Sequence, residues 1–283
     1  MGSDLMFAQL FGYYLLNKNI ISPEQLNDAL ANKNKYAMRF GSLVTNAGYM
    51  TAEQVEYVHA EQKRVDRKLG DIAVFMGFLT KGQLDELLVK QQQDDVALAE
   101  ALISKGYITD TEYENLKKTY RQEFGIEQDI DDKNLSRDIA NIYDLAEDHA
   151  NYISLFVRNV IRFVGDDFAL ATFNLEKDGK PECFVCQHFT GGSNAQTGIF
   201  GSQKAFSEFT KRYMGRSADS LYTGPVDFLN LQNGLYSSNM FAVNGRKLSF
   251  GDVICTDNKI ISAKSIVVPL SFPFGKIYIS LCF

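Results

Sequence analysis

The chain has 283 residues, 45% of them hydrophobic, which exceeds the roughly 100 to 200 residues of a typical domain and predicts two cores. Its 29 basic and 35 acidic residues leave a net charge of −6, and neither half concentrates the basic residues that a nucleic-acid partner needs. No stretch reaches the roughly 18 apolar residues of a membrane span, and residues 1–9 lack the segments of a secretory signal, so a cytoplasmic protein is expected.

The first half of the chain repeats every 29 residues. The repeat shows as a glycine at positions 12, 41 and 70, as asparagine or glycine at 19, 48, 77 and 106, and as a hydroxyl residue at 22, 51, 80 and 109. A fixed period of this kind is typical of repeat architectures, in which each unit packs on another. We therefore predict an all-helical repeat domain of four units over residues 5–125.

Each hydroxyl residue is predicted to begin the longer helix of its unit. It is followed three residues later by Gln or Glu, which forms a capping box in which both side chains bond backbone amides of the first turn. The pairs are Ser22 with Gln25, Thr51 with Gln54, Thr80 with Gln83 and Thr109 with Glu112. Upstream segments such as 42–48 are predicted to be brief helices that end at a left-handed glycine. Each unit is therefore expected to be a short helix, a turn and a longer helix.

The two central units resemble the MshEN domain, the N-terminal domain of type II secretion and pilus assembly ATPases. The resemblance is carried by Arg39-Phe-Gly41, Gly48-Tyr-Met-Thr51 and Gln62, and again by Lys68-Leu-Gly70, Gly77-Phe-Leu-Thr80 and Gln91. Some members of that family bind cyclic di-GMP, so the resemblance implies a nucleotide-binding site. The candidate residues are Arg39, Gly41, Gln62, Lys68, Gly70 and Gln91.

Two interpretations of this pattern stay open. A cation before a glycine turn can meet a phosphate or stack on guanine, and the turn lets backbone amides approach the ligand. Alternatively, the pattern only builds the fold, and the repeats serve as a docking module. Only the central units could bind in this way, because Leu10 and Ala97 replace the cation in the outer units. Within the central units, Lys68 lacks the planar fork of arginine.

An acidic segment without apolar periodicity, residues 126–136, is predicted to be a linker. One long helix over 136–164 is expected to begin the following domain, residues 137–283, with strands at 168–175 and 182–189 after it. A helix capped by Ser202 and stopped by Gly215 comes next, then a helix from Pro225 to Met240.

The tail of the chain adds three strand candidates, at 247–255, 260–271 and 275–283. The order of elements indicates an α+β domain with an antiparallel sheet and long helices on one face.

The four cysteines, at 183, 186, 255 and 282, are too few for a disulfide scaffold. Only Cys183 and Cys186 form a CxxC, and they fall in a predicted strand, where positions three apart face opposite sides. Core cysteines are therefore favoured over a metal or redox site. The three histidines are scattered along the chain, and no metal site is expected.

The C-terminal domain resembles the CheC/CheX family of chemotaxis phosphatases. The resemblance is carried by the block Gly224-Pro-Val-Asp-Phe-Leu-Asn-Leu-Gln-Asn-Gly234 and by the terminal run from Ser265 to Phe283. That family removes the phosphoryl group from the response regulator CheY through an ExxN motif on an exposed helix. The carboxylate engages the regulator's active-site lysine, and the Asn orients the attacking water. Carried over, the catalytic candidates are Asp227 and Asn230, one helical turn apart.

The resemblance implies signal transduction with a CheY-type response regulator as partner, and Mg²⁺ held by the regulator's own carboxylates rather than by this chain. The sequence departs from the family in having Asp227 for Glu and no proline between Pro225 and Pro269.

Two functions stay open. One is a regulator phosphatase with an N-terminal docking or regulatory module. The other is a non-enzymatic adaptor or cyclic di-GMP sensor with a degenerate phosphatase domain. Exposed strand edges in a small sheet also make a homodimer reasonable.

Overall fold

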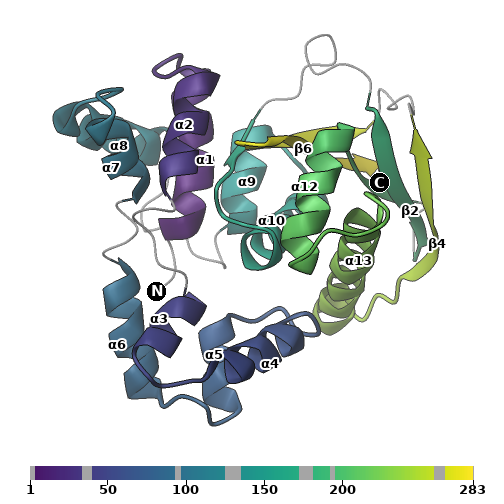
Figure 1. The fold of residues 1–283 in the computed structure, drawn as a ribbon. Coiled ribbons are helices and arrows are strands. Elements are labelled where there is room, and N and C mark those ends of the chain that lie inside the picture. The colour runs from purple at the N-terminus through teal and green to yellow at the C-terminus, as the bar shows by residue number, and fades with distance from the viewer. Residues whose placement is uncertain are drawn as a thin grey trace.

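A computed structural model describes residues 4–33, 40–92, 97–124, 135–171, 181–191, 195–257 and 265–282. Helices occupy the N-terminal half, and a six-stranded sheet flanked by helices forms the C-terminal half (Figure 1).

Every predicted repeat unit consists of two helices. The eight helices are α1 (Asp4–Asn17), α2 (Pro23–Lys33), α3 (Phe40–Asn46), α4 (Ala52–Gln62), α5 (Leu69–Phe75), α6 (Lys81–Gln92), α7 (Ala97–Ser104) and α8 (Asp110–Glu123). All four capping boxes are confirmed, with the hydroxyl oxygen 3.2 Å from the N3 amide and the Gln or Glu oxygen 2.8 Å from the cap amide. The predicted left-handed positions are confirmed as well, with positive φ at Asn19, Gly48, Gly77 and Gly106.

The repeated glycine lets the two helices of a unit cross closely. An added Cβ would lie 3.4 Å from Leu26 at Gly12, 3.1 Å from Val55 at Gly41 and 2.4 Å from Leu84 at Gly70. These three neighbours occupy the same position in their respective units. The period of the glycine therefore has a packing explanation in every unit that carries it.

The units associate in two pairs rather than in one row. The outer pair consists of α1, α2, α7 and α8, with α2 against α7 and α1 against α8. The inner pair consists of α3 to α6, with α3 against α6 and α4 against α5. The inner pair has its own hydrophobic cluster, whereas the outer pair belongs to the large cluster that also contains the C-terminal half.

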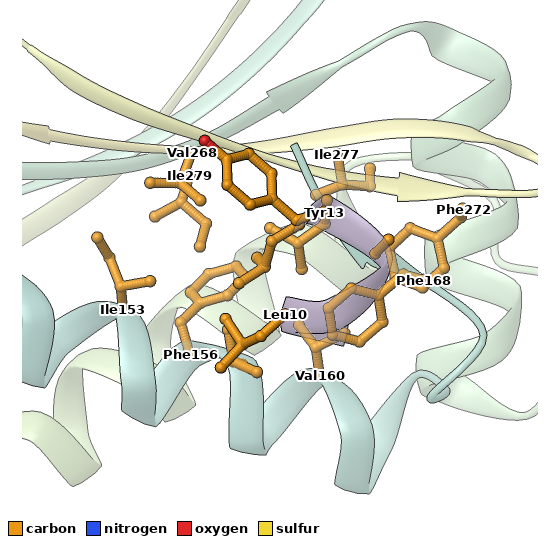
Figure 2. Packing of buried hydrophobic residues seen from close by; sticks show 14 of the residues in the cluster. Leu10, Tyr13, Ile153, Phe156, Val160, Phe168, Val268, Phe272, Ile277 and Ile279 are labelled. Carbon is orange, nitrogen blue, oxygen red and sulfur yellow. The ribbon is translucent and has the colours of Figure 1, made fainter. Parts of the chain in front are cut away.

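The outer pair joins the C-terminal core through α1. Figure 2 shows Leu10 and Tyr13 pointing at side chains of the sheet and of the long helix that follows α9. An added Cβ at Gly12 would lie 3.2 Å from Cβ of Ala169. Leu10 and Ala97 are each 1% exposed, so the position that carries a cation in the inner units is a core position in the outer ones. The sequence predicts separate cores for the two halves of the chain. Only the inner pair has a core of its own, because the outer pair shares one with the C-terminal half.

The C-terminal half contains an antiparallel sheet in the strand order β1-β5-β6-β3-β2-β4, which confirms the predicted α+β class. Its elements are α9 (Leu135–Tyr143), α10 (Glu147–Phe163), β1 (Ala169–Leu170), β2 (Cys183–Thr190), β3 (Ala195–Gly201), α12 (Gln203–Met214), α13 (Thr223–Asn244), β4 (Ser249–Asp257), β5 (Ile266–Phe272) and β6 (Gly275–Cys282). Of the predicted linker, residues 126–134 lie outside the described residues, and 135–136 already belong to α9.

The single helix predicted over 136–164 is wrong, because the chain breaks between α9 and α10. Asp144 adopts a left-handed conformation with a φ of 51°, which a continuous helix cannot contain. The two later helices are confirmed. Ser202 caps α12 by accepting from the amide of Ala205 at 3.2 Å, and Gly215 ends it with a φ of 69°. Of the strand predicted at 168–175, the structure shows β1, and residues 172–175 lie outside the described residues.

The two faces of the sheet contain different clusters. One face packs against α10, α12 and α13, whereas the other contains Phe184, Cys186, Phe200 and Tyr278. The rings of Phe200 and Tyr278 stack with centroids 4.5 Å apart. Cys183 belongs to the helix-side cluster and Cys186 to the other, so the prediction that the CxxC faces both sides of a strand is confirmed.

Candidate functional site

Close packing at its first turn fixes the orientation of α13. An added Cβ at Gly224 would lie 2.6 Å from Cα of Thr210 on α12, so only glycine fits this crossing. Phe228 is fully buried, with its ring 5.1 Å from that of Phe156 and 5.2 Å from that of Phe209. Because Phe228 points into the core, the residues on the opposite side of α13 face outward.

The structure brings Asp227 and Asn230 together on that outward side. Both side chains are exposed, and they are separated by about one turn of α13. Tyr213 lies nearby on α12, edge-on to Phe228 at 5.5 Å. Burial, and to a smaller extent the charge of Asp227, raises the pKa of Tyr213 to about 12. The phenol therefore stays protonated at neutral pH beside the carboxylate.

Gln187, a residue that sequence reasoning missed, contacts the inner side of Asn230. Its Nε2 donates to Asn230 Oδ1 at 3.4 Å and to the Gly251 carbonyl at 2.9 Å. Its Oε1 accepts from Asn233 Nδ2 at 2.7 Å. The available signal was the alternation of β2, because Gln187 falls on the same face as the buried Cys183 and Val185. A polar residue on a buried strand face needs partners and therefore calls for an explanation.

Helix α10 contains an asparagine, Asn159, but its side chain is not exposed like that of Asn230. Asn159 is fully buried and donates from Nδ2 to Gln232 Oε1 at 2.8 Å. Phe156, which stands three residues earlier, is also fully buried. With both positions buried, α10 serves as a core helix.

The nucleotide candidates have structural partners where they are described. Gly41 and Gly70 lie at helix crossings, and Gln62 is 3% exposed and donates to the Arg67 carbonyl at 2.8 Å. Lys68 is half-buried just before α5. Arg39 and the side chain of Gln91 lie outside the described residues. Cyclic di-GMP binding stays a prediction of the resemblance.

Among the residues that the structure describes, no three His, Cys, Asp or Glu side chains come close enough together to hold a metal ion. No helix among the described residues is both long and apolar enough to cross a membrane.

Neither a protein-family model nor a curated protein matches the sequence. The C-terminal half is similar to solved chemotaxis proteins at low identity. A CheC-like superfamily protein from Shewanella sp. PV-4 is 18% identical with a TM-score of 0.40, over 49% of this chain and 98% of that protein. CheX from Vibrio vulnificus is 12% identical with a TM-score of 0.39, over 48% and 96%. CheX from Borrelia burgdorferi, solved with CheY, BeF₃ and Mg²⁺, is 10% identical with a TM-score of 0.38, over 46% and 94%.

Proposed function

We propose that the C-terminal half binds a phosphorylated CheY-type response regulator and hydrolyses its aspartyl phosphate with Asp227 and Asn230. The observation that carries the proposal is the exposed turn of α13, which presents a carboxylate and a carboxamide side by side while Gln187 contacts the carboxamide from within. The N-terminal repeats then serve docking or regulation.

The reaction needs positioning rather than a covalent intermediate. Water attacks phosphorus, the bond from phosphorus to the regulator's aspartyl oxygen breaks, and the products are inorganic phosphate and the free carboxylate. Asp227 would pair with a lysine of the regulator and align the two proteins, and Asn230 would hold the attacking water. Mg²⁺ on the regulator's own carboxylates would offset the charge of the phosphoryl group.

The decay of a phosphorylated CheY-type regulator from the same organism tests this function. We expect the 283-residue chain at saturating concentration to accelerate the decay by at least about a hundredfold, which corresponds to about 2.7 kcal/mol of barrier. Phosphate release, with and without the chain, is the measurement. Binding without acceleration would instead support the adaptor function, and the absence of both would overturn both functions.

A further inference from the structure

The orientation of the Gln187 carboxamide is fixed by a backbone carbonyl. Pairing between β2 and β4 shifts between Gln187 and Phe189, which marks a bulge on β4. Beside this bulge the Gly251 carbonyl accepts from Gln187 at 2.9 Å. A carbonyl can only accept, so the end of Gln187 that faces it must be the NH₂ group.

The other end of Gln187 belongs to a buried network. Its Oε1 accepts from Asn233, whose own Oδ1 accepts from the Tyr152 hydroxyl at 2.7 Å and from Thr197 at 3.2 Å. Gln187 is 6% exposed, and the other three residues are at most 1% exposed. Buried polar groups are costly to leave unpaired, so Gln187 Oε1 keeps its bond to Asn233, and Thr197 alone still holds Asn233 when the Tyr152 hydroxyl is removed.

We propose that Gln187 is a positioning residue that decides which end of the Asn230 carboxamide faces the partner. Gln187 Nε2 donates to Asn230 Oδ1, so the Asn230 NH₂ group points away from the sheet. This inference rests on the proposed function. There, the outward NH₂ donates to the oxygen of the attacking water, which keeps its other lone pair for phosphorus.

Gln187→Leu in the full chain tests the proposal, because leucine fills a similar volume without donating. We expect the dephosphorylation rate at saturating regulator to fall about tenfold while the half-saturating regulator concentration stays unchanged. Tyr152→Phe is the matched control. It removes a hydroxyl from the same buried network and leaves the bond from Gln187 to Asn230 in place, so its rate should stay within about twofold of the parent.

A second readout does not depend on activity. The side-chain amide group of Asn230, observed by NMR relaxation, should be more mobile in Gln187→Leu than in the parent and in Tyr152→Phe, because its oxygen loses the donor that holds it. Unchanged mobility would overturn the positioning role even if the rate falls, because the loss would then be structural. Greater mobility in a chain that fails to dephosphorylate the regulator would retain the positioning role and reject the proposed function.

A different observation concerns the inner pair, which meets the C-terminal half through polar contacts and through the ring of Phe163. Asp66 lies between Arg158 and Arg162 of α10, at 2.7 and 2.6 Å, and accepts from Asn239 of α13 at 3.3 Å. His59 contacts the Arg162 carbonyl at 3.0 Å. Burial raises the pKa of Asp66, but Arg158 and Arg162 together lower it by a larger amount. The net shift is downward, so the carboxylate is charged at neutral pH.

The segment that carries Asp66 also approaches the candidate site, through Lys63. Lys63 Nζ is 4.8 Å from the centre of the Tyr213 ring, and the same ring packs on Phe228, the neighbour of Asp227. In Figure 1, α4 lies beside the C-terminal end of α13, whereas Asp227 lies near the N-terminal end of that helix, so the inner pair approaches the site through Lys63 and the Tyr213 ring. A specific partner covers about 800 Å² of each protein, which as a disc has a radius of about 16 Å. A disc centred on Asp227 therefore covers about ten residues along α13, which stops short of Asn239, and comes to the inner pair only at Lys63, beside the Tyr213 ring.

We infer that the inner pair is an autoinhibitory cover held beside the regulator-docking face by Asp66, and that it must move aside for the regulator. Because the inner pair has its own hydrophobic cluster, it can leave α10 without exposing a shared core. This inference also rests on the proposed function, since it concerns the regulation of the same site.

Asp66→Ala should lower the half-saturating regulator concentration about fivefold, because the cover is released more often. Asp66→Asn keeps the size of the side chain and should act in the same direction, which guards against misfolding of the alanine variant. Asp85→Ala is the control in the same pair, because Asp85 forms an exposed ion pair with Lys81, and its loss should change nothing.

A higher half-saturating concentration in both Asp66 variants would mean that the inner pair assists docking, and no change would mean that it lies outside the docking face. Either result overturns the cover. Hydrogen exchange over residues 154–163 should rise in both variants even without the regulator. If the exchange rises but no regulator binds, the proposed function is wrong and the release of the inner pair is supported. If the exchange does not rise, the inner pair is not a cover held by Asp66.

Discussion

Asn230→Ala is expected to remove about a hundredfold of the acceleration of regulator dephosphorylation, since alanine cannot hold a water against phosphorus. The side chain is exposed and lies in the interior of α13. Alanine is the best helix former, so the free energy of unfolding should stay equal or rise by a few tenths of a kcal/mol. The measurement is phosphate release from the phosphorylated regulator at saturating concentration of the variant. Binding of the regulator should persist, because Asp227 is untouched.

Asn244→Ala provides the matched control for this substitution. Asn244 is the last residue of α13, and its Oδ1 accepts from the Arg246 amide at 3.0 Å, far along the helix from Asp227. We expect its dephosphorylation rate to equal that of the parent. A rate for Asn230→Ala within about threefold of the parent would remove Asn230 from the reaction.

The local structure of the repeats could be predicted from sequence because it is encoded locally. Ser22 with Gln25 and the three equivalent pairs close capping boxes within three residues, and the left-handed positions follow from Asn19 and the equivalent glycines. The pairing of the units could not be read in this way. It depends on which units bury their faces against the sheet, and the period is the same in all four.

The burial of α1 in the C-terminal core can be recognised in the sequence once the structure is known. Leu10 occupies the position of Arg39 and Lys68, and the same helix carries Phe11, Tyr13, Tyr14 and Leu15, all buried. A helix that is apolar on nearly every side is a buried helix rather than an amphipathic repeat helix. The sequence shows the loss of the cation, but the burial that explains it depends on long-range contacts.

The candidate site likewise has a part that the sequence predicts and a part that it does not. Asp227 and Asn230 could be identified because their spacing places them on one face of a helix, which is a local property. Gln187 is 43 positions away from Asn230 in sequence, and its role depends on the bulge in β4 and on the carbonyl of Gly251. The helix break at Asp144 was missed because apolar residues continue at helical spacing on both sides of it.

Asp227→Glu is expected to raise the dephosphorylation rate about tenfold. The added methylene extends the reach of the carboxylate by about 1.5 Å, and a misplacement near 1 Å can cost about a hundredfold in rate. Asp227 is exposed, so the longer side chain meets solvent rather than the core. The measurement is phosphate release over a range of regulator concentrations, which separates the maximal rate from binding.

Asp227→Asn is the companion variant, because it keeps the shorter length and removes the charge. If the carboxylate pairs with a lysine of the regulator, this variant should bind more weakly, and Glu should bind at least as well as Asp. A rate for Asp227→Glu equal to or below that of the parent would show that reach does not limit the reaction. If Asp227→Asn also binds like the parent, the carboxylate of Asp227 has no role in binding the regulator. Asn230 would then be the remaining candidate in this turn of α13.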